Sequence, residues 1–281
     1  MCNSSDGRFR FQKRGHSIVR CGACNLHYYP WEPAEDDIDR LYGETYFMDG
    51  GDGYPDYVAD EAAHRKQARR YLRRLRRVGV QTGSLLDVGC AAGFFLDEAR
   101  RAGWDVIGCD VSAYACRHAE RLGLDVLRAT FAAAPLPARF FDVVTMFNTF
   151  EHLPRPREVV ARVESLLRPG GVFVFETWDR DALVARLLRQ RWPQYSPPSV
   201  LHYFARRDLE RLLEPSHWEW VAYGSAAKWL SVRHGLSLLD HQLQDTLLAG
   251  PCGRIARSVP ASLSVPYRLG DLVFGICQLR K

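Results

Sequence analysis

Between residues 84 and 178 the sequence alternates short apolar runs with amphipathic stretches of about ten residues. The apolar runs begin with SLLDVG (84–89) and DVIGCDV (105–111), and they continue with DVLRATF (125–131), FDVVTMFN (141–148) and VFVFETW (172–178). Strands separated by helices of this length predict βαβ units and therefore a parallel sheet. We expect an α/β fold with helices on both faces of the sheet.

The segments on either side of this alternation predict the domain organisation. Residues 1–50 are aromatic and rich in turns, and a Gly/Asp/Pro cluster marks a boundary near Gly50 to Pro55. We expect a small N-terminal module over 1–50 and a main domain over 55–281. Its core spans about 57–178, and residues 179–281, which include an amphipathic stretch over 236–249, form a C-terminal cap and the final strands of the sheet.

The composition limits the class of protein. Hydrophobic residues make up 47% and charged residues 25% of the 281 residues, which excludes a disordered or fibrous chain. No run approaches the eighteen or so apolar residues of a membrane span, and the polar start MCNSSDGRFR predicts no signal peptide, so we expect a cytoplasmic protein. The net charge is +5, and most of the basic residues are arginines. This charge does not by itself indicate a nucleic-acid binder.

A glycine loop follows the first strand of the alternation. The strand ends at Asp87, glycines follow at 89 and 93, and the next strand ends at Asp110. Glycines let the backbone approach a ligand, and an acid at the end of the second strand suits ribose hydroxyls. The loop reads G-x-A-x-G, not the G-x-G-x-x-G of dinucleotide sites. A carboxylate at Asp87 suits a cationic amino-acid group, so the pattern favours S-adenosylmethionine over a nicotinamide.

Four ordered motifs carry a family resemblance. The segments LLDVGCAAGFF, GCDVS, FDVVTMFNTFEHL and LLRPGGVFVFET resemble those of class I S-adenosylmethionine-dependent methyltransferases, especially the bacterial small-molecule branch with the ubiquinone-type O-methyltransferases. The resemblance covers about residues 57–177 and implies a Rossmann-like, mostly parallel sheet of seven strands. It also implies the following cofactor-binding residues: Asp87, Gly89, Cys90, Ala91, Gly93, Asp110, Val111, Thr130, Phe131 and Asn148.

One position departs from the family. Many members have an acid after the third strand that accepts a hydrogen bond from the adenine amine. The matching stretch here, ATFAAAPLP, offers only Thr130, Phe131 and alanines. We expect Phe131 to lie beside the adenine while backbone groups make the polar contacts.

A cysteine pair lies near the N-terminus. The segment VRCGACNLHYY resembles a module with two C-x-x-C pairs that precedes many methyltransferases of this branch, where four thiolates make a structural zinc site. This sequence has Cys21 and Cys24, and of the first pair only Cys2. His27, or else His16, would complete a zinc-ribbon-like site. A decayed site, a missing N-terminal stretch, or a knuckle held by aromatic packing remains an alternative.

Two histidines are candidates for the general base that an oxygen or carbon acceptor usually needs. His152 follows the fourth strand, where relatives place it near the cofactor, and a packing role is the alternative. His202 lies in PPSVLHYF, which matches a P-x-x-H-x-x-F-like element of this branch, and we expect it over the mouth of the pocket. A structural hydrogen bond is its alternative role.

The sequence as a whole favours an enzyme that methylates a small molecule, with O-methylation preferred. A natural product, a sugar or an envelope glycolipid is the typical acceptor of such relatives, and many of them are homodimers. One alternative is an RNA methyltransferase that uses the cysteine module and the arginine-rich helix near residues 58–78, although nucleic acid is disfavoured. Another is a methyltransferase fold that binds without catalysis.

Overall fold

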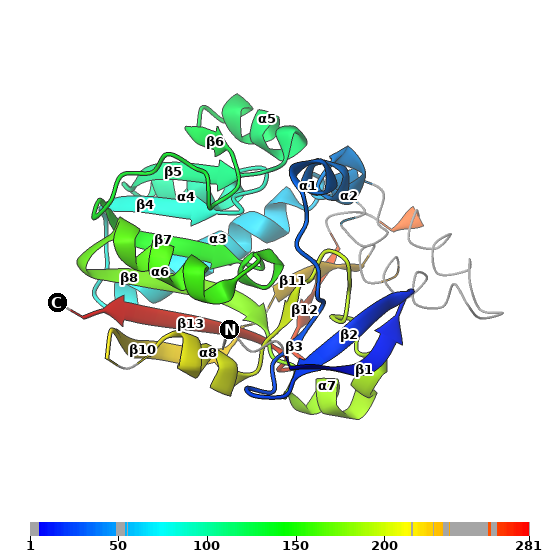
Figure 1. Cartoon of the computed structure of the whole chain (residues 1–281). Helices are drawn as coiled ribbons and strands as arrows, with labels where there is room; N and C mark the ends of the chain where they lie inside the picture. The colour runs from blue at the N-terminus through cyan, green and yellow to red at the C-terminus, as the bar shows by residue number, and fades with distance from the viewer. Residues whose placement is uncertain are drawn as a thin grey trace.

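Seven strands form the central sheet of the computed structural model, which describes residues 6–48, 54, 56–214, 216–226, 228–232, 236, 258, 259 and 263–280 (Figure 1). Their order is β10-β13-β8-β7-β4-β5-β6. The bounds are β4 Ser84–Val88, β5 Asp105–Asp110, β6 Val126–Arg128, β7 Phe141–Phe147, β8 Leu167–Trp178, β10 Trp218–Ser225 and β13 Leu272–Leu279.

The strands of the alternating region are parallel, as predicted. β4 pairs in parallel with β5 and β7, β5 with β6, and β7 with β8. β13 runs antiparallel to both of its neighbours, β8 and β10. The α/β fold with a mostly parallel seven-stranded sheet is thereby confirmed.

Helices cover both faces of the sheet because neighbouring residues of each strand point to opposite faces (Figure 1). Leu85 packs with the helices α3 Glu61–Arg77, α4 Phe94–Arg101 and α5 Ala113–Arg121 on one face. Leu86 packs with α6 Pro156–Leu166 and α8 Arg206–Leu212 on the other face. None of the helices in the described part of the chain is long and apolar enough to cross a membrane.

The N-terminal segment forms a small sheet of its own. β1 Gly7–Lys13, β2 His16–Cys21 and β3 His27–Tyr28 pair antiparallel, and β9 His202–Tyr203 adds a fourth strand from the cap. The helices α1 Glu35–Leu41 and α2 Glu44–Met48 follow. The predicted boundary near Gly50 to Pro55 lies mostly outside the described residues.

The cap adds short elements after β8. They are α7 Leu183–Leu188, the 3₁₀ turn η2 Arg189–Arg191, and the antiparallel pair β11 Lys228–Ser231 and β12 Ser264–Tyr267. A second 3₁₀ turn, η1 Phe150–His152, follows β7. The amphipathic stretch that we predict over 236–249 lies outside the described residues, apart from its first residue.

A buried ion pair joins the N-terminal small sheet to the segment that follows β8. Arg180, just after β8, contacts the carboxylate of Asp208 on α8, and these two side chains are 2% and 0% exposed. The same guanidinium donates to the carbonyl oxygens of Tyr203 (2.7 Å) and Asn25 (3.0 Å). One cation therefore contacts α8, β9 and the turn after β2.

Candidate active site

A cavity of about 750 Å³ lies at the carboxyl ends of β4, β5, β6 and β7. This edge of an open parallel sheet is where such folds bind ligands, and the volume is typical of a small-molecule site. Residues after these strands form one side of the cavity. The other side comes from the N-terminal segment, including Trp31, Ile38, Tyr42 and Tyr46.

The predicted glycine loop forms part of the cavity wall. Gly89 has φ +72° and Gly93, which precedes α4, has φ +79°, so both have the left-handed backbone that glycine favours. A Cβ on Gly89 would lie 2.3 Å from Oγ1 of Thr149. Ala91 also lines the cavity, whereas Cys90 is buried with its sulfur close to Gly108. The loop therefore presents backbone to the cavity.

We expect Gly89→Ala to lower the free energy of unfolding by about 2 kcal/mol, because the new methyl group combines a strained φ with the Thr149 contact. Gly79→Ala is the matched control, since Gly79 has φ +85° and no described residue beyond its chain neighbours comes within 4 Å of the place that a Cβ would take. It should cost about 1 kcal/mol from backbone strain alone. Urea unfolding of both variants measures the difference, and equal losses would show that the Thr149 contact adds nothing.

Two buried carboxylates end the neighbouring strands β4 and β5. Asp110 lines the cavity, and its oxygens accept hydrogen bonds from the backbone N–H groups of Ala91 and Ser112, both at 2.8 Å. Asp87 lies behind the wall and accepts a bond from Oγ1 of Thr145 at 2.6 Å. Burial raises the pKa of both carboxyls, that of Asp87 to about 7. Both acids would be stabilised in the charged form by a cationic ligand.

The remaining predicted cofactor residues lie around the same cavity. Val111, Thr130 and Phe131 line it beyond β5 and β6, and the guanidinium of Arg162 lies 5.2 Å from the centre of the Phe131 ring. Asn148, with φ +49°, follows β7 and also lines the cavity. Aromatic and backbone groups thus occupy the place of the acid that many family members have after the third strand.

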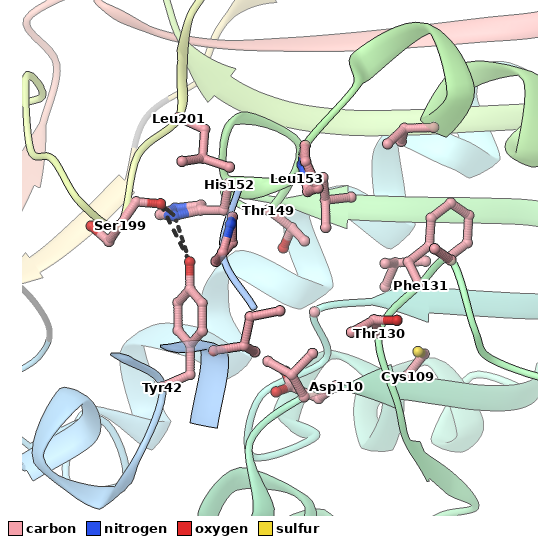
Figure 2. A pocket seen from close by; sticks show the side chains of 18 of the residues that line it. Tyr42, Cys109, Asp110, Thr130, Phe131, Thr149, His152, Leu153, Ser199 and Leu201 are labelled. Atoms are coloured by element: carbon pink, nitrogen blue, oxygen red, sulfur yellow. Dashed lines mark hydrogen bonds between the residues drawn. The ribbon is translucent and has the colours of Figure 1, made fainter. Parts of the chain in front are cut away.

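His152 lies in the cavity wall, where its ring contacts Ser199 and Tyr42. Its Nδ1 is 2.6 Å from the carbonyl oxygen of Ser199 and 3.2 Å from the hydroxyl of Tyr42. Figure 2 shows Tyr42 directed at both groups, with Thr130 and Phe131 on the opposite side of the view. Because a carbonyl only accepts, Nδ1 carries the proton, and Nε2 of the neutral ring keeps its lone pair. Burial lowers the pKa of His152 to about 4.

The structure does not place His202 over the cavity mouth, where the sequence motif puts it. His202 pairs with Tyr28 in the small sheet, stacks on Phe204 with ring centres 5.9 Å apart, and makes a backbone hydrogen bond with Leu153. It is absent from the residues that line the cavity. Its pairing with β3 therefore positions it behind the wall, where it supports the turn that carries His152.

Among the residues that the structure describes, Cys21 and Cys24 lie in one hydrophobic cluster, but no third predicted zinc ligand joins them. Cys21 and Cys24 are buried beside Leu26, whereas Nδ1 of His27 lies 2.9 Å from the hydroxyl of Tyr195 in another hydrophobic cluster. Within the described ranges, no three His, Cys, Asp or Glu residues could hold a metal ion, and the predicted Cys3His set is not supported. Cys2 lies outside these ranges. Burial and nearby arginines lower the pKa of His27 to about 3.

Comparison with known proteins shows the family. A family model described as a methyltransferase domain matches residues 61–222, more than half of the chain. The chain belongs to the class I S-adenosylmethionine-dependent methyltransferases.

Curated members of this methyltransferase family resemble part of the chain. The ubiquinone biosynthesis O-methyltransferase of Ralstonia nicotianae is 39% identical over 141 residues, which are 47% of this chain and 57% of that protein. Its counterpart in Pectobacterium atrosepticum is 36% identical over 114 residues, which are 38% and 47% of the two chains. This methyltransferase thus spans about half the length of these relatives.

A solved methyltransferase structure shows the same fold over nearly the whole chain. It is the 1,6-didemethyltoxoflavin-N1-methyltransferase of Burkholderia thailandensis, with bound 1,6-didemethyltoxoflavin and S-adenosylhomocysteine. The match has a TM-score of 0.52 at 17% identity, and it covers 98% of this chain and 100% of that one.

Sequence reasoning missed Tyr42 and Tyr46, which lie outside the part that resembles the family. Both line the cavity. Their four-residue spacing in LYGETYF is the one signal that they share, because it places both hydroxyls on one side of a helical segment. The spacing does not predict that this side of the segment faces the cavity.

Proposed function

We propose that this chain transfers a methyl group from S-adenosylmethionine to a hydroxyl group of a small, largely apolar acceptor. The observation that carries the proposal is the cavity at the sheet edge, which joins the glycine loop to the carboxylate of Asp110. Gly89 lets the backbone of the loop pack closely against Thr149, which also lines the cavity. These features fit the amino-acid and ribose groups of the donor.

Specific residues would hold the donor. Gly89 and Ala91 would approach its amino-acid part with backbone groups, Asp110 would accept hydrogen bonds from the ribose hydroxyls, and Thr130 and Phe131 would flank the adenine. When bound, the donor supplies an electrophilic methyl group on a sulfonium. The buried carboxylates of Asp87 and Asp110 supply negative charge to a ligand that carries positive charge.

The acceptor would lie between the N-terminal segment and the turn after β7. Trp31, Ile38 and Leu41 line the cavity from the N-terminal side, and Leu153 and Leu201 line it from the other. This predominantly apolar wall suits a natural product or another aromatic or lipid-like molecule better than a free sugar. It lies mostly outside the matched domain, so acceptor choice would rest on the N-terminal segment.

His152 would take the proton from the acceptor hydroxyl. Its ring is held by Ser199 and Tyr42, so Nε2 is the nitrogen available to a ligand. The low pKa keeps the ring neutral at physiological pH, so Nε2 can accept a hydrogen bond from the hydroxyl, and it also makes the ring a weaker base than a histidine that titrates near pH 7. Transfer to a well-placed hydroxyl oxygen needs alignment above all, and the fixed ring provides it.

Calorimetric titration of the purified protein with S-adenosylhomocysteine tests the donor site. Micromolar one-to-one binding, followed by methyl transfer from labelled S-adenosylmethionine to members of a panel of phenols and other hydroxylated apolar molecules, is the expected result. A folded sample that binds no S-adenosylhomocysteine contradicts the proposal. Binding without transfer to any acceptor of such a panel would favour a methyltransferase fold that only binds.

The state of His152 can be measured without an acceptor. We expect ¹⁵N NMR to show a neutral ring with the proton on Nδ1 at pH 7, and a titration near pH 4, because burial disfavours the charged form. The spectrum of His152→Gln identifies the signal by its loss. A ring that is protonated on Nε2, or that titrates near pH 6.5, would contradict the assignment.

A further inference from the structure

Two buried glutamates lie behind Asn148. Glu176 on β8 is 2% exposed and Glu151 in η1 is 1% exposed. Both carboxylate oxygens of Glu176 accept hydrogen bonds. The donors are the hydroxyl of Tyr71, Nε2 of Gln67 at 3.0 Å and Nδ2 of Asn148 at 2.8 Å. These hydrogen bonds from the protein stabilise the charge of Glu176.

The carboxylate of Glu151 accepts fewer side-chain hydrogen bonds than that of Glu176. Its Oε2 accepts a hydrogen bond from Oγ1 of Thr177 at 2.9 Å, whereas its Oε1 is buried with no hydrogen-bond partner among the described residues. Burial raises the pKa of Glu151 to about 7, against the lowering effect of hydrogen bonds from its own backbone N–H and from Thr177, and the charge of Glu176 adds to the rise. The carboxylate of Glu151 is thus a buried charge that the protein stabilises only in part.

The two glutamates differ in the positively charged residues near them. Lys228 on β11 interacts electrostatically with both, and although burial acts against its charge, its neighbours raise its pKa overall. Arg74 on α3 interacts with Glu176. Within the described part of the chain, Glu176 therefore interacts with two cations, Arg74 and Lys228, and Glu151 with one of them, Lys228.

The charge of Glu151 reaches the cavity. Tyr42 and Tyr46 line the cavity, and burial raises the pKa of both. The charges of Asp110 and Glu151 raise the pKa of Tyr42 further. They also raise the pKa of Tyr46, after the larger effects of Tyr54 and Tyr42. Among the residues that the structure describes, Tyr42, Tyr46, Glu176 and Lys228 are the titratable groups that interact electrostatically with Glu151. The residues on either side of it in the turn, Thr149 and His152, also line the cavity.

We propose that the carboxylate of Glu151 makes the cavity favour the sulfonium donor over the thioether product. The inference rests on the proposed function. S-adenosylmethionine carries one positive charge more than S-adenosylhomocysteine and is otherwise nearly the same molecule. A partly compensated negative charge in a buried site stabilises the additional cation and contributes little to a neutral sulfur. Product would then leave more easily than donor.

Calorimetry with three ligands at pH 8 tests this inference. The ligands are S-adenosylmethionine, S-adenosylhomocysteine and sinefungin, an unreactive analogue with an amine near the position of the sulfonium. Glu151→Gln should weaken binding of the two cationic ligands roughly tenfold and that of S-adenosylhomocysteine less than about twofold. Glu120→Gln, the same change at an exposed position on α5, should leave all three affinities unchanged.

The unaltered protein supplies a second measurement in case Glu151→Gln does not fold. Glu151 is mostly protonated at pH 6 and ionised at pH 8, so the preference for S-adenosylmethionine over S-adenosylhomocysteine should rise roughly three- to tenfold between these pH values. Titration of Asp87 affects both ligands, because both carry the amino-acid group, and largely cancels in the ratio.

The outcomes separate the two proposals. Equal weakening of all three ligands by Glu151→Gln, or a preference that stays constant from pH 6 to pH 8, would overturn the role of Glu151 and leave the proposed function standing. A folded wild-type protein that binds none of the three ligands would overturn the proposed function and this inference with it.

Discussion

Replacing Asp110 with asparagine is expected to weaken S-adenosylhomocysteine binding about 100-fold. The carboxylate accepts hydrogen bonds from Ala91 N–H and Ser112 N–H and, in the proposed complex, from the ribose hydroxyls. Asparagine keeps the size of the side chain but removes the charge and one accepting oxygen, and hydrogen bonds to a charged group are worth about 1.5–3 kcal/mol each. Calorimetry of the purified variant measures the loss.

Asp105→Asn is the matched control for this change. Asp105 begins the same strand, β5, but it is exposed at the opposite end from the cavity, so its replacement should leave the affinity unchanged. If Asp110→Asn binds S-adenosylhomocysteine as tightly as the wild type, the ribose does not lie where we propose. A loss of the same size in both variants would point to a general effect on the strand.

Asp208→Asn is expected to lower the free energy of unfolding by about 3–5 kcal/mol. Arg180 would remain buried against the carbonyl oxygens of Tyr203 and Asn25 without a negative partner, and removing one member of a buried ion pair has a cost of this order. Urea unfolding, followed by tryptophan fluorescence and by far-UV circular dichroism, measures the change. A loss below about 1 kcal/mol would contradict the assigned role.

An exposed pair nearby provides the comparison. Arg207 and Asp181 form an ion pair whose side chains are 49% and 41% exposed. Asp181→Asn should therefore lower stability by less than about 1 kcal/mol, since solvent screens exposed charges. Both variants exchange aspartate for asparagine and both break a contact with an arginine, so the contrast reports the burial of Asp208 together with its hydrogen bond to the backbone N–H of Ala205 at the start of α8.

The sheet and the glycine loop could be predicted from the sequence because local patterns determine them. Leu85 and Leu86 are adjacent in a continuous apolar run, and a strand that is buried on both faces requires such a run. Gly89 and Gly93 lie between strand and helix as predicted, and both have positive φ angles. The motifs also placed Asp110 at the strand end, where it lines the cavity.

The acceptor side could not be predicted in the same way, because it depends on contacts between distant segments. His202 follows a family motif, but its position is determined by the pairing of β9 with β3, which joins residues about 170 positions apart, and no local pattern specifies this pairing. The contact between Tyr42 and His152 spans 110 positions. Glu151 gives no sequence signal of a buried, partly satisfied charge.

The position of β13 has a consequence for how the protein is made. β13 lies between β8 and β10, yet a ribosome synthesises residues 272–279 after both of these strands. Until β13 emerges, β8 and β10 each present an unpaired edge, and such edges are templates for pairing with other nascent chains. A translation product that stops after β10 would therefore expose two apolar strand edges, and we expect it to aggregate or to depend on chaperones.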